Sequence, residues 1–262
     1  MDLQLTNKTA LVTGSTAGIG LAIAQRLAAE GASVILTGRT QARLDEARAA
    51  ILQESPRAEV RGVAVDFGKV AEINQLLQQV PAVDILVNNV GIFDPKPFAE
   101  IPDAEWLNFF EVNVLSGVRL SRQYFPLMLK QNWGRILFIS SESALQIPAE
   151  MIQYGTTKTA QLAVARGLAE LTKGTGVTVN SVLPGPTASE GVEGFLEKMS
   201  GGKSREQAEK EFFEQARPSS LLLRFATPAE VANMVAYLAS PLASATNGAS
   251  VRVDGGVVRS IG

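Results

Sequence analysis

The feature that most limits how this chain can fold is a repeated alternation of short apolar runs with longer amphipathic segments. Thr9–Thr13 is a short apolar run that ends at Gly14, and a helical pattern over Ile19–Glu30 follows before Gly31. This is the order strand, glycine turn, helix and glycine stop. The apolar runs are nearly continuous rather than alternating with polar residues, which is typical of strands with helices on both faces. The pattern predicts an α/β fold, a doubly wound parallel sheet with helices on both faces.

The same alternation continues to the end of the chain. The further predicted strands are Ser33–Thr37, Val60–Val65, Ile85–Asn88, Ile136–Ile139, Val177–Val182 and Ser250–Val253. The further predicted helices are Gln41–Ser55, Val70–Val80, Ala104–Lys130, Tyr154–Leu171 and one that begins at Thr227-Pro228. No repeat or domain boundary interrupts the 262 residues, so we expect a single domain over 1–262.

One segment departs from the alternation, between Pro184 and Pro228. It contains several glycines and a charged stretch, Arg205–Arg217, whose apolar face is thin. An excursion of this length inside a compact fold is more often a functional lid than a linker. We therefore expect a substrate lid at about 186–226.

Composition excludes several classes of function. The net charge is -2, and no run of Lys or Arg suggests a nucleic acid or an anionic membrane as partner. The chain has no cysteine and no histidine, which excludes disulfides, the usual zinc sites and serine-histidine triads, so we expect no metal. The N-terminus lacks a basic segment followed by a long apolar one, and no stretch is apolar enough to span a membrane. These observations predict a soluble, cytoplasmic protein.

A tyrosine and a lysine, Tyr154 and Lys158, lie four positions apart at the start of an apolar helical run. On a helix this spacing places the two side chains one turn apart on the same face. A free phenol titrates near pH ~10, and an ammonium ~4 Å away could favour the tyrosinate by about two or three pKa units. The pair is therefore a candidate acid/base. The alternative is an exposed helical pair without chemistry.

The segment Thr13-Gly14-Ser15-Thr16-Ala17-Gly18-Ile19-Gly20 lies between the first strand and the first helix. Glycines at this turn let backbone N–H groups approach a pyrophosphate, and the helix N-terminus adds a partial positive charge. The spacing is G-x-x-x-G-x-G rather than G-x-G-x-x-G. The alternative is a glycine-rich turn that binds no ligand.

With these motifs, the chain resembles the compact single-domain branch of the short-chain dehydrogenase/reductase family over nearly its whole length. The motifs that carry the resemblance are Thr13 to Gly20, Asn88-Asn89-Val90-Gly91, Ile139 to Ser141, Tyr154 with Lys158, and Pro184-Gly185, in that order. The resemblance is closest to oxidoreductases similar to 3-oxoacyl-ACP reductase. It implies a Rossmann-type fold and an NAD(P) cofactor.

The end of the second predicted strand bears on the choice of cofactor. An acid there would accept the ribose hydroxyls of NAD, whereas a basic side chain would meet the 2′-phosphate of NADP. Gly38 carries no acid and Arg39 supplies a positive charge, so we expect NADP (NADPH), with NAD less suited. The alternative is a solvated Arg39, since Ala17, where many NADP-using relatives have a second basic residue, is neutral.

The resemblance also implies the other cofactor contacts. The residues expected at the phosphates are Gly14, Ser15, Thr16, Gly18, Ile19 and Gly20. Those expected at the adenine, the ribose and the nicotinamide are Asp66, Phe67, Asn89, Val90, Gly91, Tyr154, Lys158, Pro184, Gly185 and Thr187. Asp66 could instead cap the following helix. Val90 replaces the family's alanine, and Ser189 stands where the family has a threonine, so Thr187 and Ser189 both remain candidates for the nicotinamide amide.

The family's catalytic serine lies thirteen residues before its tyrosine, which gives Ser141, with Ser140 as its structural neighbour. By resemblance, Ser141 fixes the substrate oxygen, Tyr154 exchanges its proton, and Lys158 lowers the phenol pKa and binds the ribose. Asn113 is a poor mid-helix residue. The resemblance implies that it distorts the helix and holds a water that links Lys158 to solvent, while a purely structural asparagine is the alternative.

The expected substrate is a small-molecule carbonyl or alcohol, with a ketone or 3-oxoacyl compound as the first expectation. The alternatives are a steroid, sugar or polyol dehydrogenase and a non-enzymatic NADP-binding sensor on the same fold. The resemblance also implies a homodimer or homotetramer, assembled through the two long helices around the fifth strand. Gln161 to Leu171 is rich in alanine and leucine, which suits such packing.

Overall fold

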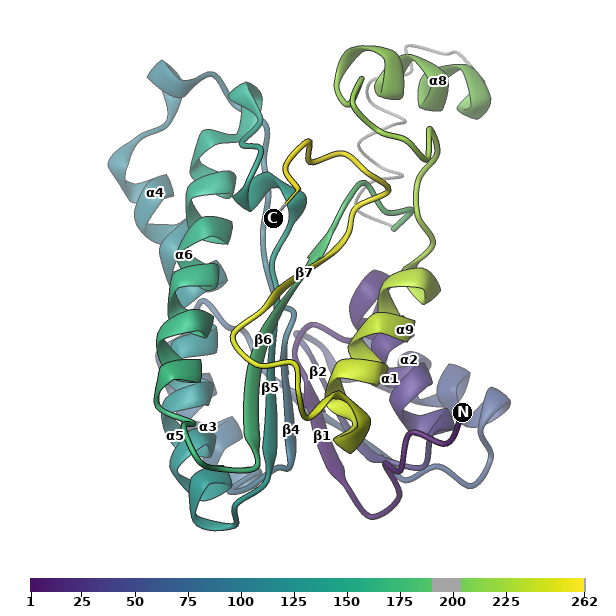
Figure 1. Cartoon of the computed structure of the whole chain (residues 1–262), viewed down its shortest axis with the longest axis vertical. Helices are drawn as coiled ribbons and strands as arrows, with labels where there is room; N and C mark the ends of the chain where they lie inside the picture. Colours follow the sequence, from purple (N-terminus) through teal and green to yellow (C-terminus); the bar gives the residue numbers. More distant parts are fainter. Residues whose placement is uncertain (190–203, 262) are drawn as a thin grey trace.

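The computed structural model describes residues 1–189 and 204–261, and a seven-stranded parallel sheet lies at its centre (Figure 1). The strand order is β3-β2-β1-β4-β5-β6-β7. The strands are β1 (Thr9–Val12), β2 (Ser33–Gly38), β3 (Val60–Ala64), β4 (Ile85–Asn88), β5 (Gly134–Ile139), β6 (Val177–Pro184) and β7 (Ser250–Val253). The chain moves outward from β1 to β3 and then returns to the other side of β1 with β4. Open α/β sheets bind ligands at such a switch point, outside the carboxyl ends of the strands.

Helices cover both faces of the sheet, as the sequence predicts. The helices are α1 (Gly18–Ala29), α2 (Gln41–Glu54), α3 (Val70–Gln79), α4 (Asp103–Phe110), α5 (Ser116–Lys130), α6 (Ile152–Glu170), α8 (Arg205–Gln215) and α9 (Pro228–Ala239). In Figure 1, α1, α2 and α9 lie on one side of the sheet and α3, α5 and α6 on the other. The predicted helix start at Thr227-Pro228 is confirmed, because Thr227 and Glu230 form a capping box in front of α9.

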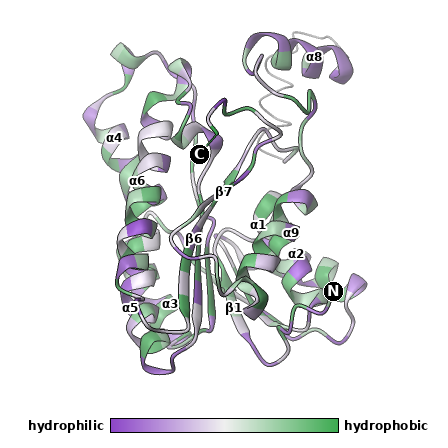
Figure 2. Cartoon of the chain, in the orientation of Figure 1, coloured by the Kyte–Doolittle hydropathy of each residue, from purple (hydrophilic) through white to green (hydrophobic). Residues whose placement is uncertain are grey.

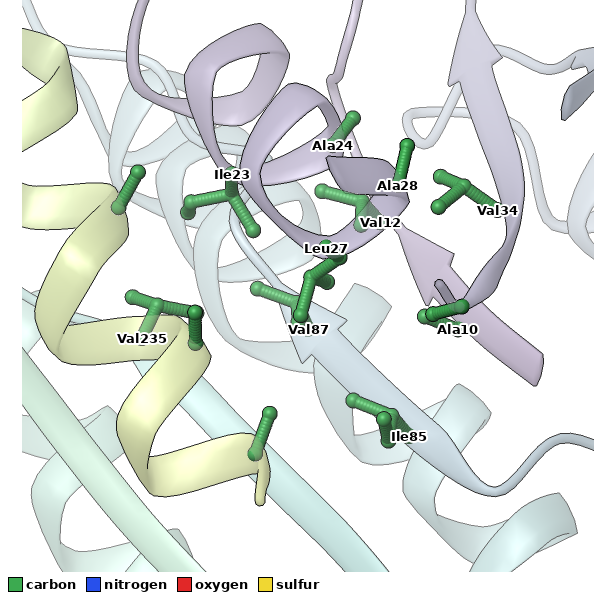
Figure 3. Close-up of a cluster of buried hydrophobic side chains, with 14 of the residues drawn as sticks. Ala10, Val12, Ile23, Ala24, Leu27, Ala28, Val34, Ile85, Val87 and Val235 are labelled. Atoms are coloured by element: carbon green, nitrogen blue, oxygen red, sulfur yellow. The ribbon is translucent and has the colours of Figure 1, made fainter. Parts of the chain in front are cut away.

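The core is divided between the two faces of the sheet. Neighbouring strand residues point to opposite faces, so Leu11 belongs to one buried cluster and Val12 to the other. Figure 3 shows the cluster that contains Val12, in which Ile23 and Leu27 of α1 and Val235 of α9 pack over the strands. Each such side chain contributes about 1.5–3 kcal/mol when fully buried. This packing fixes the position of α1, and therefore of the glycine turn that precedes it.

The predicted helix Ala104–Lys130 is interrupted in the structure by a π-helical turn. α4 and α5 are joined without a loop, but the turn between them, Glu111–Leu115, is π-helical. Asparagine competes for backbone hydrogen bonds inside a helix, and Asn113 lies in this turn. The predicted strand Val177–Val182 is also longer in the structure, since β6 pairs with β7 as far as Pro184.

The predicted lid at about 186–226 is only partly within the described residues, because 190–203 lie outside them. Helix α8 lies beyond the carboxyl edge of the sheet and is largely hydrophilic (Figure 2). The Ser204 side chain accepts a hydrogen bond from the Gln207 N–H at its start. Phe212 and Phe213 pack with Phe225. The function of this segment as a lid remains a prediction.

Among the described residues, no helix is long and apolar enough to cross a membrane. The cytoplasmic location remains a prediction. The same part of the chain contains no cluster of acidic side chains suited to a metal ion.

Candidate active site

The glycine turn after β1 needs glycine for conformation at two positions and for space at a third. Gly14 and Gly18 have φ of +61° and +54°, in the left-handed region that side chains disfavour. A Cβ on Gly20 would lie 2.3 Å from the Gly14 carbonyl oxygen and 2.6 Å from Asn89 Nδ2. The turn therefore presents bare backbone at the N-terminus of α1, as an anion site requires.

Thr13, which the sequence analysis included in the motif without giving it a role, fastens this turn to the segment after β4. Its hydroxyl oxygen accepts hydrogen bonds from the N–H groups of Asn89 (2.8 Å) and Val90 (2.9 Å). The Asn89 side chain donates in return to the carbonyls of Thr13 (2.9 Å) and Gly14 (3.1 Å). The position of Thr13 directly before Gly14 was the signal available in the sequence.

Ser15 is held within the chain, and its predicted cofactor contact remains a prediction. It is fully buried, and its hydroxyl donates to the Val12 carbonyl (2.8 Å) and accepts from the Thr37 N–H (3.0 Å). Its own N–H donates to the Thr37 carbonyl (2.9 Å). Both donors of Ser15 are therefore used inside the chain, where they hold the glycine turn against β2.

The end of β2 has no acid and packs against the glycine turn. A Cβ on Gly38 would lie 2.4 Å from Thr16 Cγ2, so the glycine turn packs directly on this strand. The next residue, Arg39, is exposed, and no described residue forms a hydrogen bond with its side chain. Its guanidinium is thus available to a ligand at the carboxyl end of β2.

Asp66 does not cap the helix that follows it. Its Oδ1 accepts from the Gly68 N–H (3.0 Å), and its own N–H donates to Glu72 (2.8 Å). The N-cap residue of α3 is Lys69, which makes no side-chain capping bond. The other interpretation of Asp66, as an adenine contact, stays a prediction. Phe67 beside it is buried in the core, which leaves only its backbone for a ligand.

A cavity of about 490 Å³ lies at the carboxyl ends of β4, β5 and β6. It brings together residues that the sequence analysis assigned to the nucleotide and to catalysis. Those that line it are Ile19, Asn89, Gly91, Ser141, Tyr154, Lys158, Pro184, Gly185, Thr187 and Ser189. Ile19, in the first turn of α1, and the candidate acid/base therefore face one space. The cavity is also lined by Phe93, Glu142, Glu150 and Arg217, which the sequence analysis did not select.

Lys158 is buried on α6, one turn after Tyr154. Its Nζ donates to the Ile139 carbonyl at the end of β5 (2.8 Å) and lies 3.4 Å from Gln161 Oε1. It is 5.5 Å from the centroid of the Tyr154 ring. Burial lowers the pKa of Lys158 to about 8, because an ammonium loses solvation inside the protein. These contacts exclude the exposed helical pair that the spacing left open.

The pKa of Tyr154 moves in the opposite direction to the one expected. Burial raises the pKa of the phenol well above its usual value, and the Glu142 carboxylate raises it further. A hydrogen bond with Ser141 and the charge of Arg217 oppose this rise. Lys158 is not among the groups that shift this pKa, so the expected lowering by Lys158 is not found. Tyr154 is therefore protonated at neutral pH, which suits a proton donor.

Ser141 follows β5 and begins a short 3₁₀ turn, Glu142–Ala144. Its Oγ accepts from the Ser143 N–H (3.1 Å) and donates to Glu142 Oε2. The adjacent Ser140 donates to the Lys158 carbonyl (2.9 Å), which ties the end of β5 to α6 and agrees with a structural role. The Glu142 carboxylate thus accepts the hydrogen bond of the Ser141 hydroxyl, the group predicted to bind the substrate oxygen.

Asn113 organises the site from below, since its side chain is buried and does not line the cavity. Its amide accepts from the Ile92 N–H (2.8 Å) and donates to the Ile92 carbonyl and to Thr157 Oγ1 (both 3.0 Å). Its backbone carbonyl accepts from Gln161 Nε2 (2.5 Å). Gln161 therefore bridges Lys158 and Asn113. As a polar residue three positions after Lys158, it was visible in the sequence but was not selected.

The two candidates for the nicotinamide amide both face the cavity. The Thr187 hydroxyl donates to the Gly185 carbonyl (2.9 Å), and Thr187 pairs with Ala226 in an isolated parallel bridge. Ser189 lies close to Gly18, 3.2 Å from where a Cβ on that glycine would be. The structure places Ser189 nearer to the glycine turn and ties Thr187 to the segment before α9.

Comparison with known families agrees with this geometry. The model of the short chain dehydrogenase family matches residues 8–199, which is most of the chain. The chain belongs to the short-chain dehydrogenase/reductase family.

Relatives within this family extend over the full chain. The uncharacterized oxidoreductase YvaG of Bacillus subtilis (strain 168) is 48% identical over 263 residues and covers 100% of both chains. The 3-oxoacyl-[acyl-carrier-protein] reductase FabG of Aquifex aeolicus (strain VF5) is 34% identical and covers 98% of this chain and 100% of its own. The L-sorbose reductase of Gluconobacter frateurii, solved with NADPH and L-sorbose, is 30% identical with a TM-score of 0.93 and full coverage of both chains.

As a short-chain dehydrogenase/reductase, this protein is an NAD(P)-dependent enzyme that acts on CH–OH or C=O groups. The Rossmann-type sheet predicted from the sequence is confirmed by its structural neighbours as well as by its own topology.

Proposed function

We propose that this protein is an NADP(H)-dependent oxidoreductase in which Tyr154 is the general acid/base for reduction of a carbonyl or oxidation of a secondary alcohol. One observation carries the proposal: Tyr154, Ser141 and Lys158 line the same cavity as Ile19 and Asn89 beside the glycine turn. A proton donor and a nucleotide site that share one space can act on the same carbonyl.

The residues present fit the cofactor. Bare backbone at Gly14, Gly18 and Gly20 leaves room that any Cβ would fill. In this proposal the phosphates lie on that turn with Thr16 and Ile19, and the 2′-phosphate meets Arg39. The proposed adenine, ribose and nicotinamide contacts are Asp66, Phe67, Asn89, Val90, Gly91, Pro184, Gly185 and Thr187. When bound, the reduced nicotinamide supplies the hydride.

The protein's own groups handle the proton and the oxygen. The Ser141 hydroxyl donates a hydrogen bond to the substrate oxygen and so stabilises the charge that develops there. Tyr154 gives its proton to that oxygen as the carbon receives the hydride, which completes the two-electron reduction to an alcohol. Lys158 holds the ribose and stabilises the resulting tyrosinate. The second lone pair of the Asn113 carbonyl is proposed to bind the water through which Tyr154 is reprotonated.

Two substrate classes are supported by relatives. The similarity to the Aquifex aeolicus reductase supports a 3-oxoacyl compound as the substrate of this protein. The similarity to the L-sorbose reductase supports a ketose, or the corresponding polyol in the reverse direction.

The test is consumption of NADPH, with NADH in parallel, against a panel of 3-oxoacyl thioesters, diketones, quinones, ketosteroids and ketoses. Tyr154→Phe removes the proton donor and is expected to lower kcat by about 10²–10⁴ while NADPH affinity stays nearly unchanged. Turnover like that of the wild type in this variant contradicts the assignment. Tight NADPH binding without turnover of any compound favours the NADP-binding sensor instead.

We also propose that the enzyme is a homodimer or homotetramer. Leu115, Leu127 and Leu171, at or near the ends of α5 and α6, are exposed. Large exposed apolar residues at these long helices fit the expected packing between copies. Light scattering that shows a monomer at micromolar concentration contradicts this proposal.

A further inference from the structure

The cavity contains an ion pair that the proposed proton chemistry does not use. Glu142 Oε1 accepts from Arg217 Nε (3.1 Å), and the two side chains are only 6% and 8% exposed. Arg217 also donates from Nη1 to Glu150 (3.4 Å) and to the Ala216 carbonyl (2.8 Å). Buried charges need hydrogen-bonding partners. The atoms of this ion pair that face the cavity therefore restrict which substrate groups can lie beside them.

The pair is coupled to catalysis through Ser141. The Ser141 hydroxyl has one proton, and in the free enzyme that proton is donated to Glu142 Oε2. Ser141 cannot donate to a substrate oxygen until this hydrogen bond breaks. Once it breaks, Oε2 is a buried charged acceptor without a donor, which is unfavourable.

A substrate compensates for the lost hydrogen bond if one of its own groups donates a hydrogen bond to Glu142 Oε2. The required donor lies close to the oxygen that Ser141 takes up, and a hydroxyl on the carbon next to the carbonyl meets this condition. The same hydroxyl can accept from Arg217 Nη2, with which no described residue forms a hydrogen bond. A carboxylate on that carbon would instead face the Glu142 carboxylate and be repelled.

We propose that Glu142, supported by Arg217, is a specificity residue that selects neutral α-hydroxy ketones, ketoses included, and the corresponding vicinal diols. The substrate hydroxyl replaces Ser141 as the donor to Glu142, and Ser141 turns to the reacting oxygen. This inference rests on the proposed reductase function and narrows its substrate to one class.

The test compares 1-hydroxybutan-2-one with 1-methoxybutan-2-one, with NADPH as reductant. The methoxy group withdraws electrons from the carbonyl much as the hydroxyl does but has no proton to donate. For the wild type, we expect kcat/KM to be about 10- to 100-fold higher for the hydroxy ketone, as for a hydrogen bond to a charged group. A ratio near one in the wild type overturns the proposal.

Glu142→Gln keeps the size of the side chain and removes its charge, so the ratio is expected to fall to about threefold or less. Glu150→Gln is the matched control, since Glu150 also pairs with Arg217 but does not contact Ser141. Its ratio is expected to equal that of the wild type. A Glu142→Gln enzyme that keeps the full preference overturns the proposal, because a purely structural Glu142 would not affect the ratio.

The experiment also distinguishes a failure of the specificity proposal from a failure of the proposed reductase function. If the wild type reduces diketones with NADPH and Tyr154→Phe does not, but hydroxy ketones have no advantage, the specificity proposal fails and the reductase stands. If no carbonyl is reduced, both fail. Should Glu142→Gln not fold, competitive inhibition of the wild type by butane-1,2-diol and by its 1-methyl ether gives the same comparison. Equal inhibition by the two compounds overturns the proposal.

Discussion

The two ends of the cavity differ in which elements hold their polar groups in place. At the cofactor end, Thr13 and Asn89 bond to each other's backbone and to the glycine turn, and both lie directly after central strands. At the substrate end, Glu142 pairs with Arg217, which follows α8 and belongs to no strand of the sheet. The first arrangement follows from the sheet itself, whereas the second depends on a segment outside it.

This difference separates what the fold supplies from what this particular chain adds. A site formed by strand ends and one turn is specified by the topology and suits a cofactor shared by many enzymes. A site completed by a side chain from outside the sheet can change without disturbing the sheet. We therefore expect changes at the cofactor end to affect every substrate alike, and changes at Glu142 to affect substrates selectively.

The largest effect is expected from Gly20→Ala. The new Cβ would overlap the Gly14 carbonyl at 2.3 Å, so α1 must move away from the turn. A displacement of this kind is expected to weaken NADPH binding by about a hundredfold, for all substrates equally. Titration of NADPH fluorescence measures the loss.

Gly167→Ala is the matched control for this prediction. Gly167 is also a helical glycine, but an added Cβ there meets nothing within 4 Å. It is expected to raise the free energy of unfolding by roughly 0.5–1 kcal/mol and to leave NADPH affinity unchanged. Equal NADPH affinity in the two variants would show that close approach at the turn does not matter.

A smaller effect is expected from Arg39→Ala, which removes the only basic side chain predicted to meet the 2′-phosphate. The ratio of NADPH to NADH affinity is expected to fall by about 10- to 100-fold, since a charged hydrogen bond contributes about 1.5–3 kcal/mol. NADH affinity should stay the same. An unchanged ratio would favour the solvated Arg39 that the sequence left open.

The smallest effect is expected from pH, acting through Lys158. With a pKa of about 8, the charged fraction of this side chain falls from about 0.9 at pH 7 to about 0.1 at pH 9. NADPH affinity is therefore expected to fall by up to about tenfold as pH rises over this range. Lys158→Met should bind weakly at both pH values and lose the dependence. A flat wild-type profile would contradict a role for the Lys158 charge in binding.

The sequence predicted the sheet well because its strands are buried on both faces and read as short apolar runs. It also selected Ser141, Tyr154 and Lys158, which line one cavity and whose catalytic roles remain a proposal. These residues lie at strand ends or one helical turn apart, so local spacing is enough to place them.

The sequence did not reveal contacts made by the irregular segment after β6, or the effect of burial on side-chain pKa values. Nothing in the pattern around Arg217 indicates that its side chain reaches Glu142, because the path of the chain after β6 is not periodic. The sign of the Tyr154 pKa shift also depends on burial and on Glu142, which spacing alone does not report. The motif around Ser15 also does not show that this side chain is buried and hydrogen-bonded to β2.

The π-helical turn at Glu111–Leu115 has a consequence for how this enzyme tolerates change in length. A π turn contains one residue more than an α turn of the same span, and one residue corresponds to about 100° of rotation. Deleting a single residue here would restore a regular helix but rotate α4 relative to α5, and the Asn113 amide would leave Ile92 and Thr157. The extra residue is thus what allows one continuous helix to pack against the sheet and still turn an amide toward the active site.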